Sequence, residues 1–409
     1  MSIKSTLSRL YQADVTWRTL DAFSPRILAL FLHTGALTAF GAAGYAVIAW
    51  ITSVFALTYS LLPDPHSYVL VRRQGKGALR LAGLVTPVIV AKGVLALTVS
   101  GLSAHLFLTQ SLRDSVGSSL DAYLVAGLVY SLSEAWWSYA GVISLAADRL
   151  RPTAALGLVM RLVGLALMGI AWSLGYKDPF VLALVYCGPL LLVLGFILPW
   201  AWRPKRMALF YNQGVRRYAL WSQGIGLSTG WLGQLVPIVA GLTPGISPTD
   251  LGILSYVTRV LGAAMTPLQV LQSIIIKLVA KCKDPQAPAV KRYDRWFKGA
   301  TLVLAALYSG GLLVGHWFYE VTWALCLSLA IQGLGLFIVS WHRVALTALM
   351  ASQRARPLFL VGYLPVLLLT TGLAWPVSAV SGLLGLSIMS TLGWIYIAFS
   401  WKLPFVRKP

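Results

Sequence analysis

Residues 179–202 read PFVLALVYCGPLLLVLGFILPWAW and contain no charged side chain. A helix of about 20 apolar residues is long enough to cross a hydrocarbon layer about 30 Å thick. Comparable stretches recur along the 409-residue chain, which is 58% hydrophobic and only 11% charged. Backbone polar groups in a bilayer must be satisfied within a helix or a closed barrel, and the strict alternation of a barrel is absent. The sequence therefore predicts an all-α polytopic membrane protein.

The boundaries of the apolar stretches predict about twelve transmembrane helices. Residues 27–62 form one apolar run that is too long for a single helix, so we place a break between Gly35 and Gly41. The predicted spans are residues 15–37, 40–62, 81–108, 119–146, 153–174, 179–202, 217–241, 250–276, 297–317, 321–341, 356–375 and 379–401.

The distribution of positive charge predicts the orientation of these helices. Most of the 33 Lys and Arg residues fall in segments that are cytoplasmic if the N-terminus is inside, whereas the predicted outer connections contain only Arg113 and Lys177. Basic loops resist translocation, so we expect both termini to be cytoplasmic. The net charge of +21 then reflects topology and contact with anionic lipid heads, and we expect no nucleic-acid partner. Tryptophans near span ends, such as Trp50, are typical interfacial anchors.

A short sequence motif recurs at equivalent places in the predicted topology. Thr38 is followed by Gly41 and Tyr45, and Thr249 is followed at the same spacing by Gly252 and Tyr256. The copies lie at the outer ends of the second and eighth spans. This predicts two six-helix halves, residues 1–205 and 206–409, related by a pseudo-twofold axis along the membrane normal.

Five ionisable residues lie well inside predicted spans. They are Arg26, Lys92, Glu134, Arg161 and Arg259. An ionised side chain at the centre of a membrane helix costs about 2.5–3.5 kcal/mol by insertion scales, so we expect these residues to face other helices or a wet cavity. Small and hydroxylated residues at spacings of three and four positions share the same helix faces, for example Ser255 and Gly262 beside Arg259.

These charges allow two interpretations. Glu134 can form a structural ion pair with either Lys92 or Arg161, and Arg161 can also extend toward the cytoplasmic interface. One carboxylate cannot neutralise four cations, however. We therefore expect at least two of the cations to remain available to water or to an anionic ligand.

The sequence provides little support for catalysis or for metal binding. The 5 histidines have no metal-ligand spacing, and the 3 cysteines are scattered. The chain has neither paired acidic residues nor a long outer loop, which an enzyme of glycan assembly needs. We expect no enzyme activity, no catalytic residue, no metal site and no cofactor.

The whole chain resembles the polysaccharide and lipid-linked oligosaccharide flippases of the MOP exporter superfamily. The resemblance is most specific in residues 247–281, where SPTDLGILSYVTRVL is followed by Pro267 and Lys281 and is similar to the eighth helix of the family. Related lipid II flippases commonly have an acidic residue before the arginine of this helix, whereas Thr258 precedes Arg259 here. Residues 35–50 resemble the turn between the first two helices, and Arg26 takes about the place of a first-helix cavity arginine.

The resemblance implies that the protein moves an undecaprenyl-diphosphate-linked oligosaccharide, a polysaccharide repeat unit, from the inner to the outer leaflet. It implies a location in the bacterial cytoplasmic (inner) membrane and an association with glycan polymerase machinery. The cavity cations would be Arg26, Lys92, Arg161 and Arg259, with Glu134 in an ion pair or in proton coupling. Three alternatives stay open: an ion-coupled multidrug exporter of the same superfamily, a polytopic enzyme of envelope glycan assembly, and a membrane scaffold without transport.

Overall fold

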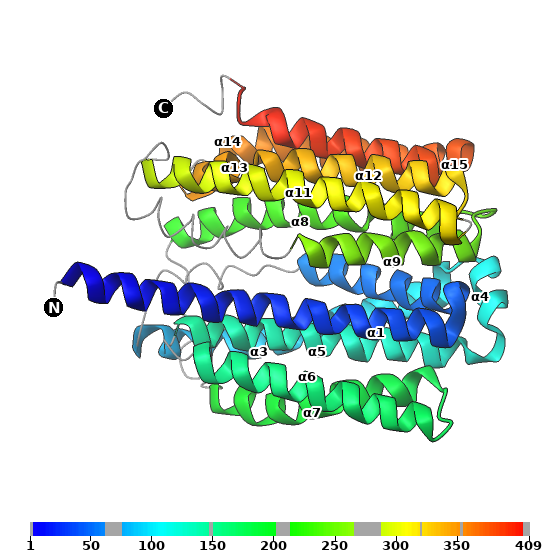
Figure 1. Ribbon diagram of the computed structural model, residues 1–409, viewed down its shortest axis with the longest axis horizontal. Helices are drawn as coiled ribbons and strands as arrows, with labels where there is room; N and C mark the ends of the chain where they lie inside the picture. The colour runs from blue at the N-terminus through cyan, green and yellow to red at the C-terminus, as the bar shows by residue number, and fades with distance from the viewer. Residues whose placement is uncertain are drawn as a thin grey trace.

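The computed structural model describes residues 3–61, 76–146, 150–201, 213–265, 288–319, 321–351 and 355–403. All regular structure in these residues is helical. The long helices run side by side along the longest axis of the molecule (Figure 1). Eight helical segments in the described residues are apolar over a length that can cross a membrane.

The described helices divide in chain order into an earlier and a later group. The earlier group is α1 (Ile3–Leu61), α3 (Lys76–Phe107), α4 (Gln110–Val116), the short η1 (Gly117–Ser119), α5 (Leu120–Ala146), α6 (Leu150–Ser173) and α7 (Pro179–Ala201). The later group is α8 (Gln213–Leu242), α9 (Pro248–Ala264), α11 (Pro288–Tyr319), α12 (Trp323–Trp341), α13 (Arg343–Ala351), α14 (Ala355–Leu358), the π-helical η3 (Phe359–Tyr363) and α15 (Leu364–Ser400). The predicted boundary between the halves, at residues 205 and 206, lies outside the described residues.

Two of the helices contain two membrane crossings each. The 59 residues of α1 would form a rod about 90 Å long at 1.5 Å per residue, three times the thickness of a hydrocarbon core. Gly41 interrupts α1 with φ 69° and ψ 172°, and Gly382 interrupts α15 with φ 54° and ψ −141°. Positive φ is accessible to glycine at little cost, so both reversals occur at glycine.

The first of these breaks falls where the sequence predicts it, at the end of the Gly35 to Gly41 window. The second falls a few residues beyond the predicted gap between residues 375 and 379. Pro376 lies inside α15, and the helix continues through it to Gly382. Neighbouring segments can compensate for the hydrogen bond that a proline removes from a membrane helix, so proline is a poor marker of a span end.

The number of crossings agrees with the predicted architecture. Eight helical segments in the described part of the chain are long and apolar enough to cross a membrane. Two of them, Leu28–Leu61 and Arg356–Ser400, contain the breaks and so count twice, and α5 and α9 pack inside the bundle. The start of α1 and the end of α15 lie at the same end of the molecule, as an even number of crossings requires (Figure 1). The predicted fold class is therefore confirmed.

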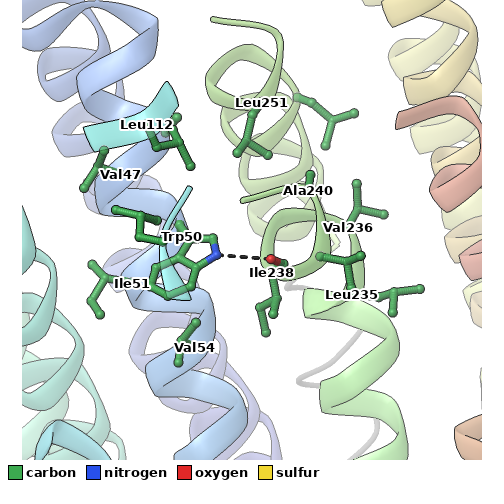
Figure 2. Packing of buried hydrophobic residues seen from close by; sticks show 14 of the residues in the cluster. Val47, Trp50, Ile51, Val54, Leu112, Leu235, Val236, Ile238, Ala240 and Leu251 are labelled. Carbon is green, nitrogen blue, oxygen red and sulfur yellow. Dashed lines mark hydrogen bonds between the residues drawn. The ribbon is translucent and has the colours of Figure 1, made fainter. Parts of the chain in front are cut away.

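The core of the molecule is formed where α1 packs against α8 and α9. Trp50 on α1 is 1% exposed, and its indole Nε1 donates a hydrogen bond to the backbone carbonyl of Ile238 on α8 at 3.1 Å (Figure 2). A Cβ atom at Gly241 would lie 2.0 Å from the Trp50 ring, so glycine permits this approach. The prediction that Trp50 is an interfacial anchor is wrong, because the ring is enclosed by α1 and α8 instead of facing lipid heads.

The two copies of the repeated motif meet at this junction. Gly252 packs so closely against α1 that a Cβ there would lie 1.9 Å from the carbonyl oxygen of Ala42. The rings of Tyr45 and Tyr256 contact each other edge to face, with centroids 6.1 Å apart. Gly41 thus provides the reversal in α1, and Gly252 provides the close contact between α1 and α9.

Candidate functional site

A cavity of about 840 Å³ lies between α1, α5, α8 and α9, so helices of both the earlier and the later group line it. This volume is near the upper end of the range of about 300–1,000 Å³ that is usual for ligand sites. We call it the central cavity. Its polar lining residues are His33, Thr52, Ser53, Tyr59, Tyr130, Ser131, Glu134, Ser138, Tyr139, Gln234, Ser255, Thr258 and Arg259.

Arg259 on α9 reaches across the central cavity to α1. Its Nη2 donates to the backbone carbonyl of Ala49 at 3.2 Å and to the hydroxyl of Thr52. Its Nη1 lies 3.5 Å from Nε2 of His33. All three partners are formally neutral groups when His33 is unprotonated. Among the described residues Arg259 therefore has hydrogen-bond partners but no carboxylate.

Helical spacing places the neighbours of Arg259 on the same wall. Ser255 and Gly262 are four residues before and three residues after Arg259, and both line the central cavity. Ser255 is buried, and its hydroxyl has no hydrogen-bond partner in the described part of the molecule. The wall of α9 thus presents one cation, whereas the unpaired hydroxyl of Ser255 is buried within this wall.

Glu134 and Arg161 form an ion pair within the earlier helices. Nε and Nη2 of Arg161 donate to the two carboxylate oxygens of Glu134, at 3.1 and 2.8 Å. Arg161 is 2% exposed and does not line the cavity, whereas the side chain of Glu134 is 27% exposed and does. Nη1 of Arg161 also donates to the carbonyl of Gly157 at 3.4 Å. Of the two pairings that the sequence left open for Glu134, the structure contains the one with Arg161.

The other two predicted cations have different surroundings. Lys92 on α3 is 5% exposed, and its ammonium group lies 4.2 Å from the ring centroid of Tyr59. Tyr59 lines the central cavity, whereas Lys92 does not. Arg26 belongs to α1, but its side chain lies outside the described residues. The structure thus brings Arg259 and Glu134 to the central cavity and places Arg161 and Lys92 behind its walls.

His33 is a cavity residue that the sequence analysis did not single out. It is buried on α1 beside Arg259, and its ring makes edge contacts with Tyr45 and Tyr130, with centroids 5.8 and 5.6 Å away. The spacing of the histidines excludes a metal site but does not address a role for a single histidine. A lone titratable residue in an apolar helix was the signal that could have identified it. In the described residues no three His, Cys, Asp or Glu side chains are grouped as metal ligands.

No protein-family model and no curated protein sequence matches the chain. Solved structures with a similar fold are MATE transporters. An inward-facing MATE-family multidrug resistance transporter of the MOP superfamily is 14% identical, with 93% of this chain and 92% of that chain covered and a TM-score of 0.57. The Vibrio cholerae MATE transporter VcmN is 13% identical, with 99% of both chains covered and a TM-score of 0.55. The eukaryotic MATE transporter AtDTX14 is 15% identical, with 100% of this chain and 96% of that chain covered and a TM-score of 0.58.

At these identities the similarity establishes the fold. The chain shares the fold of MATE transporters over at least 93% of its length. These neighbours are transporters and not enzymes. None of those described here is a polysaccharide flippase, and several are named as multidrug transporters.

Proposed function

We propose that the protein is an exporter of the MOP type that carries an amphiphile with an anionic head through the central cavity by alternating access. We further propose that its cargo is a lipid-diphosphate-linked oligosaccharide. The observation that carries the choice of cargo is the charge of the central cavity. Glu134 is neutralised by Arg161, whereas Arg259 has no carboxylate partner among the described residues.

An anionic group at Arg259 is favoured on electrostatic grounds. Two unit charges 4 Å apart attract each other by about 4 kcal/mol at an effective dielectric constant of 20. A diphosphate would add charge-assisted hydrogen bonds to this attraction. A hydrocarbon bilayer offers no comparable stabilisation to a diphosphate.

The contacts of Arg259 also suggest how binding could be coupled to movement. They join α9 to α1 across the cavity, through Ala49, Thr52 and His33. An anion that binds Arg259 competes with these neutral acceptors and so weakens a link between the two helices. A ligand can shift a conformational equilibrium only through such differential contacts. In this proposal the empty and loaded cavities favour different arrangements of the two halves.

The second candidate is an ion-coupled multidrug exporter, which the names of the solved structures with this fold favour. In this chain Glu134 could attract an organic cation, and the rings of Phe55, Tyr59 and Tyr130 could stack on it. For that to happen Glu134 must leave Arg161, and the buried Arg161 would then lack its carboxylate. The two candidates therefore require opposite charges in the same cavity.

Transport in proteoliposomes separates the two candidates. We expect wild-type protein to translocate a fluorescent lipid-diphosphate-linked oligosaccharide, Arg259→Ala to abolish this, and Arg259→Lys to retain part of it. The charge-neutral double variant Glu134→Gln/Arg161→Gln should affect that activity less than Arg259→Ala does. Transport of an organic cation that depends on Glu134 and not on Arg259, without movement of the lipid-linked cargo, would establish the multidrug candidate instead.

We also propose that the protein lies in the bacterial cytoplasmic membrane with both termini inside. The support is the predicted distribution of basic residues together with the common end at which α1 begins and α15 ends (Figure 1). A protease-cleavable tag fused after Pro409 should be cut in inverted vesicles and protected in spheroplasts.

A further inference from the structure

A second cavity of about 380 Å³ lies between α1, α5, α6 and α7. Its walls include Phe31, Phe40, Met168, Trp172 and Leu182, and none of the described residues that line it is Asp, Glu, Lys or Arg. We call it the apolar pocket. It lies entirely within the earlier helices, whereas both groups of helices line the central cavity.

The apolar pocket adjoins the central cavity at two residues. His33 and Tyr130 line both spaces, and their rings contact each other edge to face. Nε2 of His33 lies 3.5 Å from Nη1 of Arg259. One imidazole ring therefore separates the guanidinium of the central cavity from the apolar pocket.

The apolar pocket also has an open side on the surface of the bundle. Phe31 and Trp172, which line it, are 64% and 38% exposed, whereas Leu182 and Cys187 are buried. Exposed apolar side chains on membrane helices face lipid chains. The pocket thus extends from a buried floor to a rim that hydrocarbon can reach.

From this arrangement we infer that the apolar pocket holds the hydrocarbon chain next to the head of an anionic lipid cargo whose diphosphate sits at Arg259. This inference rests on the proposed function and adds a place for the chain. A cationic group in the apolar pocket would meet no carboxylate among the described lining residues, and an anionic group would meet no lysine or arginine there. A hydrocarbon chain has no hydrogen bonds to lose when it enters the apolar pocket. Because the chain is covalently attached to the head group, its pocket must adjoin the head-group site, and the two cavities adjoin at His33 and Tyr130.

For cargo that arrives from the bilayer, the apolar pocket contributes more to specificity for a lipid-linked anion than to binding affinity. Lipid tails are as apolar as the pocket, so transfer from lipid provides little hydrophobic driving force. The pocket instead fixes where the chain leaves the head group. An anion without a chain would bind Arg259 without using the apolar pocket.

A phenylalanine placed inside the apolar pocket tests the inference. Ala183 on α7 lines the pocket, whereas its neighbour Leu184 does not and is exposed on the same helix. The test compares Ala183→Phe with the matched control Leu184→Phe, both as full-length protein in nanodiscs. The probes are inorganic pyrophosphate and farnesyl diphosphate. A second pocket variant, Ala36→Phe on the opposite wall formed by α1, guards against a local folding defect at residue 183.

We expect Ala183→Phe and Ala36→Phe to raise the Kd for farnesyl diphosphate about tenfold and to leave the Kd for pyrophosphate unchanged. Leu184→Phe should change neither. Unchanged binding of farnesyl diphosphate in both pocket variants, or an equal loss for both probes, would overturn the inference. Arg259→Ala as a single substitution should raise the Kd for both probes. If it raises neither Kd, the proposed function itself fails, whatever the pocket variants do.

Discussion

Arg161 and Arg259 are both arginines within membrane helices, but their surroundings differ completely. Arg161 is enclosed among the earlier helices and bound by both oxygens of Glu134. Arg259 lines the central cavity and is held by one carbonyl, one hydroxyl and one imidazole of α1. The first arrangement cancels a charge inside the protein, and the second positions a charge without cancelling it. The depth of a charge in a helix therefore does not determine its role; its partner does.

The largest effect on stability is expected when the paired arginine loses its partner. Glu134→Ala leaves Arg161 buried without a carboxylate, which costs about 3–5 kcal/mol in comparable buried pairs. Thermal unfolding of purified protein in detergent should reveal this loss. The double variant Glu134→Gln/Arg161→Gln should recover most of it, since no buried charge then remains. If Glu134→Ala unfolds at the wild-type temperature, the ion pair is not structural.

A smaller effect is expected at the contact that lets Arg259 reach α1. In Gly252→Ala the new methyl group would collide with the carbonyl of Ala42, and overpacking of this kind costs about 1–3 kcal/mol. The matched control is Gly226→Ala on α8, where a Cβ meets nothing within 4 Å and the residue lines neither cavity. We expect transport and thermal stability to fall only in the first variant. If the two variants have equal transport and equal thermal stability, the close packing of α9 on α1 contributes to neither property.

The indole of Trp50 provides a third test of the junction between α1 and α8. Trp50→Phe keeps an aromatic ring but removes the hydrogen bond to Ile238, for which about 0.5–1.5 kcal/mol is typical. Trp341 on α12 is a half-buried tryptophan elsewhere in the bundle, and Trp341→Phe is the control. A midpoint shift in unfolding confined to Trp50→Phe is expected. A larger shift in the control would contradict the assignment of Trp50 to the core.

The smallest loss of stability is expected for the unpaired arginine. Arg259→Gln leaves no buried charge without a partner, and its acceptors on α1 stay satisfied because the Thr52 and Ser53 hydroxyls donate to the carbonyl of Ala49. Its free energy of unfolding should therefore stay within about 1 kcal/mol of wild type. The same variant should lose transport. Unfolding of Arg259→Gln as severe as that of Glu134→Ala would mean that Arg259 is structural as well.

The sequence predicted the architecture because apolar length and glycine act locally. The uncharged run 179–202 and the break at Gly41 both follow from the hydrocarbon thickness and from backbone sterics. The stripe of Ser255, Arg259 and Gly262 followed from helical spacing in the same way. None of these features depends on which distant segment lies opposite.

Features that depend on distant partners were predicted less well. From the sequence, either Lys92 or Arg161 could form an ion pair with Glu134. The packing of α5 against α6 determines that the partner is Arg161. Trp50 looked like an interfacial residue because its burial comes from α8, nearly two hundred residues later. His33 became part of the site only through the approach of α9.

The central claim is that Arg259 gives the central cavity a positive charge that Glu134 does not cancel. Titration of inorganic pyrophosphate into purified protein at low ionic strength tests it directly, with Arg259→Gln and Glu134→Gln/Arg161→Gln compared with wild type. We predict that Arg259→Gln abolishes binding and that the charge-neutral double variant binds as wild type does. Full binding by Arg259→Gln, or its loss in the double variant alone, would contradict the claim.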